Sequence, residues 1–281
     1  MADIYERLHK IMVDNWRAVV LGLISALAFL LIWQAYAGYL HGTWLFHRTK
    51  PAGIADFIPY PGAVIAAFFE SFVHRDPASQ LYMTSHILAS LKRVFLGFII
   101  ALGLAVPVGL LMGRSMGAAA AGRPIVELFR PIPPLAWIPL FLVMLGLAWG
   151  PVGIVFLGIF FPILLNVIFG ARSVDVVITD AARTLGARSR DIFIKVVLPF
   201  TLPYLMTGIK VGLGIGWMCI VAAEMLGNVG GGVGYYIFAM LPLGRIDLMY
   251  AGMLVIGLLS VLTTGVAGVI ERWVYRWMGM K

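Results

Sequence analysis

The sequence has few charged residues and almost no cysteine. Only 12% of its 281 residues are Asp, Glu, Lys or Arg, whereas a soluble domain carries about 25%. The one cysteine, Cys219, cannot form an internal disulfide and lies in an apolar run, where we expect it to pack against neighbouring side chains. An ordinary soluble domain is therefore excluded.

Motifs for covalent chemistry are also missing. None of the lysines follows a glycine, so the sequence has no Walker A loop and is not expected to bind ATP through one. There is no H-E-x-x-H or G-x-S-x-G motif, and all five histidines lie in the first third of the chain without ligand spacing. We expect no metal site, no cofactor in this chain and no catalytic role.

Long hydrophobic runs fill most of the sequence, which is 61% hydrophobic. A membrane crossing needs about 20 apolar residues. Residues 131–171 contain no charged residue and are too long for one crossing, so we expect a turn in the Gly- and Pro-containing stretch 146–153. The sequence predicts an all-α polytopic membrane protein with about six transmembrane helices, at 18–36, 94–113 (with a kink at Pro107), either side of 146–153, 202–226 and 249–270.

The basic residues divide unevenly between the two sides of the predicted membrane. Cytoplasmic segments of membrane proteins collect Lys and Arg, which also accounts for the formal net charge of +8 without nucleic acid as a partner. We therefore place both termini in the cytoplasm of a multi-pass protein of the cell (inner) membrane. This puts inside Arg7, Lys10, Arg17, Arg114, Arg123, Arg130, Arg172, Arg183, Arg188, Arg190, Lys195, Arg272, Arg276 and Lys281, and outside Arg48, Lys50, Arg75, Lys92, Arg93 and Arg245.

This topology divides the chain simply. We expect a cytoplasmic N-terminal segment at 1–17, retained rather than cleaved as a signal peptide, and a single transmembrane domain at 18–281 with an outer loop at about 40–92. Within that loop, 61–75 has apolar residues at i, i+1, i+4 and i+5 and predicts an amphipathic helix at the membrane interface or against the bundle.

The stretch DAARTLGARSRDIFIKVVLP, 180–199, is unusually charged for this chain and lies on the cytoplasmic side. We predict two short helices bent at Gly186, a residue suited to positive φ after a helix end. Thr179 and Asp180 suit a helix start, Ser189 a second cap, and Pro199 a stop. A structured charged projection suggests a docking surface.

Asp180-Ala181-Ala182, Gly186 six residues after Asp180, and the closing Val196, Leu198 and Pro199 resemble the EAA loop of binding-protein-dependent ABC importer permeases. The one departure is Asp180, where the family usually has Glu. The stretches FRPIPPLAWIPL, 129–140, and GWMCIVAAEMLGNVGGGVGYYI, 216–237, are similar to the nitrate, sulfonate and taurine branch of that family.

The resemblance implies a type I ABC importer permease fold and a homodimer of two permease copies. It also implies ABC ATPase subunits that bind ATP and Mg and receive the coupling segment, and an extracytoplasmic solute-binding protein that delivers a small oxyanion such as nitrate, an alkanesulfonate or taurine. The residues expected to contact the ATPase are Asp180, Ala181, Ala182, Gly186, Ala187, Arg188, Arg190, Asp191 and Pro199.

The translocation pathway is expected among Trp137, Asn166, Lys210, Trp217 and Glu224. Glu224 is open to two interpretations: it accepts N–H bonds from the glycine-rich turn 227–234 or pairs with a cation such as Arg245, or it acts as a gate. Lys210 either extends to the cytoplasmic interface or attracts an anion. An autonomous facilitator or channel without an ATPase is the alternative function, and an intramembrane enzyme would need a catalytic pair that the sequence does not offer.

Overall fold

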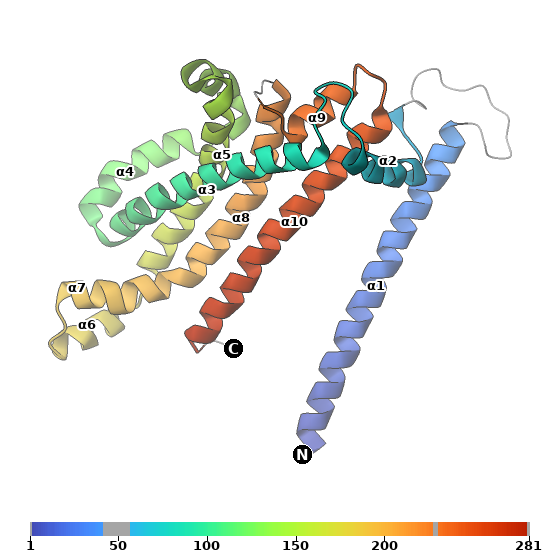
Figure 1. Ribbon diagram of the computed structural model, residues 1–281. Helices are drawn as coiled ribbons and strands as arrows, with labels where there is room; N and C mark the ends of the chain where they lie inside the picture. The colour runs from blue at the N-terminus through green and yellow to red at the C-terminus, as the bar shows by residue number, and fades with distance from the viewer. Residues whose placement is uncertain (1, 42–56, 227–229, 280–281) are drawn as a thin grey trace.

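The computed structural model describes residues 2–41, 57–226 and 230–279, and these residues form helices joined by turns (Figure 1). The turn predicted at 227–234 lies partly outside this range, because 227–229 are not described. The helices are α1 (Ala2–Leu40), α2 (Pro61–Val73), α3 (Met83–Arg114), α4 (Met116–Phe129), the 3₁₀ turn η2 (Pro134–Trp137), α5 (Ile138–Arg172), α6 (Val176–Thr184), α7 (Ser189–Ile192), the π-helical turn η3 (Phe193–Val197), α8 (Leu198–Leu226), α9 (Val233–Met240) and α10 (Ile246–Trp277).

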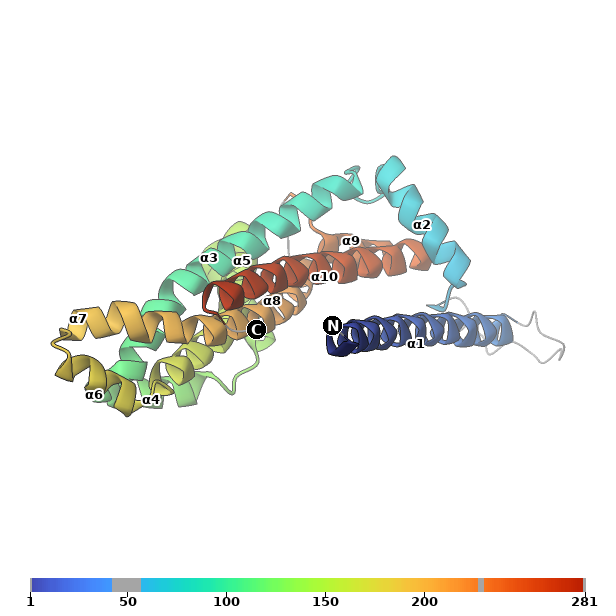
Figure 2. The same ribbon diagram turned by 90° about the horizontal axis from the view of Figure 1, so that it is seen from below.

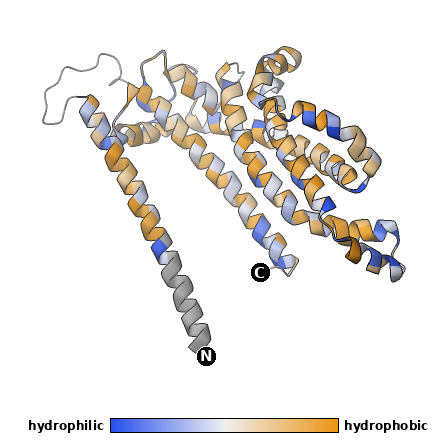
Figure 3. Ribbon diagram, turned by 180° about the vertical axis from the view of Figure 1, so that it is seen from behind, coloured by the Kyte–Doolittle hydropathy of each residue, from blue (hydrophilic) through white to orange (hydrophobic). Residues whose placement is uncertain are grey.

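Five of the described helical segments are long and apolar enough to cross a membrane. Figure 3 shows hydrophobic residues along these long helices. The spans are Val19–Leu40, Met83–Arg114, Pro134–Arg172, Ser189–Leu226 and Ile246–Trp277.

Helices α3 and α5 run parallel and in close contact. A Cβ added at Gly97 would lie 2.7 Å from Val155, one at Gly109 would lie 2.7 Å from Val167, and Gly113 approaches Ala171 in the same order. Small residues let membrane helices approach closely and gain van der Waals contact. Because the two helices are parallel, the chain must return across the bundle between Arg114 and the start of the long arm of α5.

That return differs from the predicted third crossing. The predicted break is present at Gly146, whose φ of 72° interrupts α5, but the arm before it, 138–145, is only about 12 Å long at 1.5 Å per residue. This arm folds back so that Phe141 meets Gly153. The third pass is therefore assembled from α4, η2 and this short arm rather than from one apolar helix, and residues 147–172 form the fourth.

The core lies between α3, α5 and α8. Helix α8 is antiparallel to α5: Gly208 packs against Ile163, and farther along α8 Cys219 packs against Gly158. Buried residues such as Val155, Ile159 and Ile220 fill the space between the helices. The expected packing role of Cys219 is confirmed by its burial.

A second apolar cluster joins α2, α9 and α10 at one end of the bundle, which we call the α9 end. The helix predicted at 61–75 is present as α2, but its apolar face is only partly covered: Val64 is buried, whereas Ile65 and Phe69 are exposed. Helices α6 and α7 mark the opposite end, which we call the α6–α7 end. The N-terminus of α1 and the C-terminus of α10 point toward that end as well (Figure 1).

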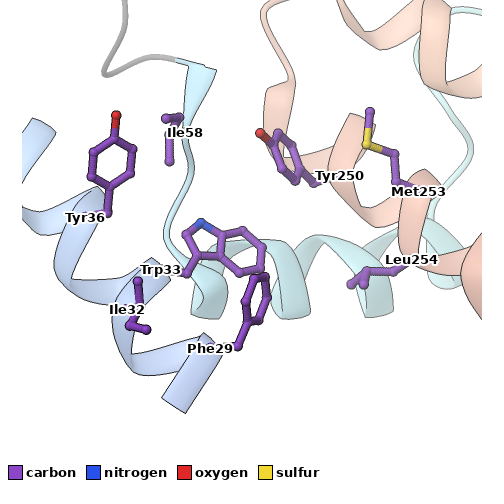
Figure 4. Close-up of a pocket in the computed structure, with 8 residues that line it drawn as sticks. All are labelled: Phe29, Ile32, Trp33, Tyr36, Ile58, Tyr250, Met253 and Leu254. Atoms are coloured by element: carbon purple, nitrogen blue, oxygen red, sulfur yellow. The ribbon is translucent and has the colours of Figure 1, made fainter. Parts of the chain in front are cut away.

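Helix α1 stands apart from the other helices (Figure 2). It meets α10 through Trp33 and Tyr250, whose ring centroids are 6.0 Å apart. An apolar groove of about 530 Å³ lies between the two helices (Figure 4). Its lining residues are Phe29, Ile32, Trp33, Tyr36, Ile58, Tyr250, Met253 and Leu254.

Candidate functional site

The charged stretch 180–199 forms a hairpin of short helices at the α6–α7 end. Its first helix, α6, begins earlier than predicted: Asp175, not Thr179 or Asp180, is the N-cap, and its carboxylate accepts the N–H of Val177 at 2.9 Å. Asp180 lies inside α6 and pairs with Arg183 at 3.1 Å. A carboxylate at the N-cap satisfies a free helix N–H, so the predicted start was wrong by about one turn.

The bend at Gly186 is confirmed. Gly186 has φ +84°, and two backbone bonds close the end of α6: its N–H donates to Arg183 O at 2.9 Å, and the N–H of Ala187 donates to Ala182 O at 3.0 Å. This is the Schellman pattern, which needs a residue in the left-handed region. The bend is therefore fixed by backbone hydrogen bonds.

The second half of the hairpin runs directly into α8. Arg188 is the N-cap of α7 without a side-chain bond, so Ser189 does not cap it. Pro199 does not stop the helix either. Proline has no N–H to donate, and the helix accommodates this by widening in the preceding π-helical turn η3, where Leu198 N–H donates to Phe193 O. The predicted pair of Asp191 and Lys195 is present at 3.3 Å. The hairpin is thus a rigid extension of α8.

The hairpin has one packed face and one exposed face. Ala182 and Ala187 pack against the core of the bundle, and Thr179 is buried. On the other face Leu185 is 88% exposed, and Arg188 and Arg190 are exposed beside it. Apolar side chains that are exposed to solvent at the tip of a charged projection are typical of a protein–protein contact. The other exposed apolar residues of α6 are Val176, Val177 and Ile178.

A buried polar cluster lies at the α9 end, around Glu224. Its carboxylate has no exposed area and accepts from Arg93 Nη1 at 2.7 Å, from Ser90 Oγ at 2.8 Å and from the N–H of Gly234 at 3.0 Å. The expected bond to the glycine-rich turn is confirmed, but the cation is Arg93 of α3 and not Arg245. Arg245 instead pairs with Glu70 at 3.1 Å and with Asp247 at 3.0 Å.

His86 continues this cluster toward the loop before α3. Its Nδ1 accepts the N–H of Gly232 at 3.0 Å and lies 3.1 Å from Gly232 O, and its Nε2 lies 2.8 Å from Asp76 Oδ2. Burial is the largest influence on Asp76 and raises its pKa, but hydrogen bonds from Ser79, His86 and Ala78 outweigh it. The net result is a pKa below the usual value. Asp76 is therefore ionised beside the ring of His86.

The other predicted pathway residues do not gather at one place. Trp217 is buried and donates to Thr263 at 2.8 Å, and Lys210 pairs with Glu271 of α10 at 2.7 Å. Asn166 donates to Pro162 O within α5, and Trp137 is partly buried beside Phe141 near the short arm. In the part of the chain that the structure describes, no three His, Cys, Asp or Glu side chains are grouped as a metal site.

Comparison with known proteins identifies relatives over most of the chain. The family model described as "Binding-protein-dependent transport system inner membrane component" matches residues 105–279. A protein of Methanocaldococcus jannaschii, named as an ABC transporter permease, is 36% identical over 95% of each chain. The taurine transport system permease protein of Escherichia coli is 34% identical over 69% of this chain and 70% of its own, and the nitrate import permease protein of Leptolyngbya laminosa is 34% identical over 66% of each.

The fold has a counterpart among solved structures. A chain of the MetNI methionine ABC transporter, in an inward-facing conformation, superimposes with a TM-score of 0.57 at 22% identity, over 67% of this chain and 94% of that one. At this identity the likeness concerns the fold alone.

Proposed function

We propose a function on the premise that the chain belongs to the family of binding-protein-dependent transport system inner membrane components, as the family match and the 36% identical relative establish. It is the permease subunit of an ABC importer, a transport component of the inner membrane. The ATP and Mg²⁺ that drive transport would be bound by a separate ATPase subunit.

The hairpin 175–197 is the proposed docking site of that ATPase. The observation that carries this is the exposed side chain of Leu185, placed beside Arg188 and Arg190 at the tip of a hairpin that backbone bonds hold rigid. A rigid link to α8 would let movement of the ATPase reach the transmembrane helices directly. The residues proposed to contact the ATPase are Asp180, Ala181, Gly186, Arg188, Arg190 and Asp191, whereas Ala182 and Ala187, which pack against the bundle, and Pro199, at the start of α8, are proposed to hold the hairpin in place.

The cytoplasmic side is proposed to be the α6–α7 end. The exposed basic residues Arg183, Arg188, Arg190 and Lys195 lie there, and basic residues near helix ends favour the cytoplasm. Both termini of the described chain point the same way (Figure 1). The α9 end would then face the solute-binding protein.

The substrate is proposed to be a small oxyanion. Relatives are named for the transport of taurine, aliphatic sulfonates, nitrate and bicarbonate. Every acidic side chain within the described candidate spans is paired with a cation: Asp191 with Lys195, Glu224 with Arg93, Asp247 with Arg245 and Glu271 with Lys210. A bare carboxylate would repel an anion, so this neutralisation suits an anionic cargo.

A second copy of the chain is proposed to cover α4. This helix buries none of its residues in the described chain, yet it belongs to the third pass and carries the exposed pair Arg123 and Glu127. Charged side chains in the membrane face protein or a water-filled pathway rather than lipid. Packing against a second copy would place this charged pair against protein or a water-filled pathway instead of lipid.

The decisive experiment is a pull-down of the tagged chain from its native membranes in mild detergent, with assay of ATP hydrolysis. A stoichiometric subunit with a Walker A loop is expected. Gly186→Val, or reversal of Arg188 and Arg190 to Glu, should abolish its recovery while membrane insertion stays normal, and Phe238→Ala at the α9 end should not. Recovery of the ATPase with both hairpin variants would contradict the docking site, and a lone chain without ATPase would favour the facilitator.

A further inference from the structure

Three side chains of α3 face the segment that leads into α9. His86, Ser90 and Arg93 are spaced i, i+4 and i+7, so they lie on one face of the helix. Each bonds to the backbone of 231–234: His86 accepts the N–H of Gly232, Ser90 accepts the N–H of Val233 at 2.9 Å, and Arg93 donates to Gly231 O at 2.7 Å. We call these three residues, with Glu224 and backbone 231–234, the α9 clamp.

Glu224 completes the clamp from α8. Its carboxylate takes the N–H of Gly234, the next free donor at the start of α9, and also holds Ser90 and Arg93. Three consecutive N–H groups at the start of α9 are thus accepted by side chains of α3 and α8. A carboxylate at a helix N-terminus is also favoured by the helix dipole.

The glycines of this segment allow the approach. A Cβ at Gly232 would lie 2.4 Å from the carboxyl carbon of Glu224, and one at Gly234 would lie 2.4 Å from Val221 O. Any other residue would push the segment away from the carboxylate. The glycine-rich sequence therefore serves close packing against Glu224.

We infer that Arg93 and Glu224 are positioning residues that fix 231–234 and α9 to α3 and α8, so that this part of the α9 end stays closed and moves as one body during transport. The inference rests on the proposed function for its orientation and its transport cycle. Glu224 is then neither gate nor substrate contact, because both of its oxygens are engaged by the clamp. The pathway must open at another part of the α9 end.

Thiol labelling tests the clamp without any partner. Val233 has no exposed area, so a Val233→Cys chain in sealed vesicles should react slowly with a membrane-impermeant maleimide. Arg93→Met and Glu224→Gln should each speed this labelling about tenfold or more, because a buried thiol reacts in proportion to the opened population. Arg93→Lys, which keeps the cation, should recover part of the protection.

The matched control breaks a neighbouring ion pair that is outside the clamp. Glu70→Gln removes one of the two carboxylate partners of Arg245 at the same end and should leave Val233→Cys protected. Phe238→Cys, exposed on α9, reports an accessible site in every background. Unchanged protection in Arg93→Met and Glu224→Gln, or equal loss in Glu70→Gln, would overturn the clamp. If Arg93→Met does not accumulate in membranes, Ser90→Ala takes its place: faster labelling of Val233→Cys would support the clamp, and unchanged protection would overturn it.

The one-body part of the inference is tested in the complex with the ATPase. Protection of Val233→Cys should be the same with and without ATP. Protection lost in one nucleotide state would show that the clamp opens during transport and would overturn the inference, leaving the importer assignment intact. Failure to recover an ATPase would instead contradict the docking proposal, while the labelling of the isolated chain would still decide the clamp.

Discussion

Lys210 of α8 and Glu271 of α10 form an ion pair of 2.7 Å across 61 positions of sequence. The side chains are 38% and 12% exposed, and the hydroxyl of Tyr275 approaches the same carboxylate at 3.4 Å. Lys210 therefore does not present a free charge to an anion in this conformation. The pair joins the two long helices α8 and α10, as does the hydrogen bond from Trp217 to Thr263.

This pair should contribute measurably to stability. We expect Lys210→Met and Glu271→Gln each to lower the thermal stability of the purified chain, and the double variant to cost less than the sum. The coupling should be about 1 kcal/mol, as for partly exposed ion pairs. Additive effects in this double-mutant cycle would contradict the pairing, and the exposed pair Arg123–Glu127 of α4 serves as a weakly coupled control.

Two glycines of α8 should respond oppositely to the same change. At Gly208 an added Cβ would lie 3.0 Å from the Cα of Ile163, whereas at Gly214 nothing lies within 4 Å. Gly208→Ala should destabilise the chain by about 1–3 kcal/mol through overpacking. Gly214→Ala should be neutral or stabilising by up to about 1 kcal/mol, because Ala favours the helix. Thermal denaturation of both variants checks this, and equal effects would contradict the α5–α8 packing.

The conformation of Gly186 should matter more than its lack of a side chain. Its φ of +84° is tolerated by Asn but costs about 1–2 kcal/mol for most other residues. No atom lies within 4 Å of an added Cβ, so a steric clash is not expected. Gly186→Asn should keep ATPase recovery in a pull-down and Gly186→Val should lose it. Loss in both variants would indicate that the ATPase needs a bare backbone at this point.

The sequence predicted those features that are local. The bend at Gly186, the pair Asp191–Lys195 and a helix within 61–75 depend on neighbours a few positions apart, and all three are present. The cap predicted at Ser189 was wrong by one residue, because Arg188 is the N-cap. The stop predicted at Pro199 was wrong because a π-turn lets the helix continue through a proline, which spacing alone does not reveal.

The partners of buried charges could not be predicted. Arg93 lies 131 positions from Glu224 and, together with Lys92 and His86, interrupts the apolar run, so the sequence favoured an outer loop ending near 92. The structure extends α3 back to Met83 and turns His86 and Arg93 toward the segment before α9, whereas Lys92 is exposed. One signal was available: His86, Ser90 and Arg93 share the i, i+4, i+7 spacing of a helix face. Arg93 in this stripe is the cation that pairs with the buried Glu224.

Tyr236 of α9 should tolerate the loss of its hydroxyl. Its Oη is buried without a hydrogen-bond partner among the described residues, and burial, the largest influence, raises its pKa well above the usual value. An unsatisfied buried hydroxyl carries a desolvation cost. We therefore expect Tyr236→Phe to leave the free energy of unfolding unchanged or to raise it by up to about 1 kcal/mol, which would appear as an equal or higher melting temperature. A clear loss of stability would show that the hydroxyl has a partner such as ordered water, and Tyr235→Phe, on the same helix and less buried, is the control.

Asp76 should give the chain an acid-sensitive contribution to stability. Its folded pKa lies below the ordinary value of 3.8, with burial outweighed by the bonds from Ser79, His86 and Ala78. Because the folded pKa is depressed, the folded state binds its proton less readily than the unfolded state, so the stabilisation is present above about pH 4 and is lost as the pH falls through the folded pKa. Melting temperatures at about pH 7 and about pH 3 should show Asp76→Asn clearly less stable than the wild type at the higher pH. The difference should shrink at the lower pH. Asp175→Asn, which changes an exposed cap carboxylate at the other end of the bundle, controls for general acid effects. A gap between Asp76→Asn and the wild type that stays constant between the two pH values would contradict an ionised Asp76 beneath His86.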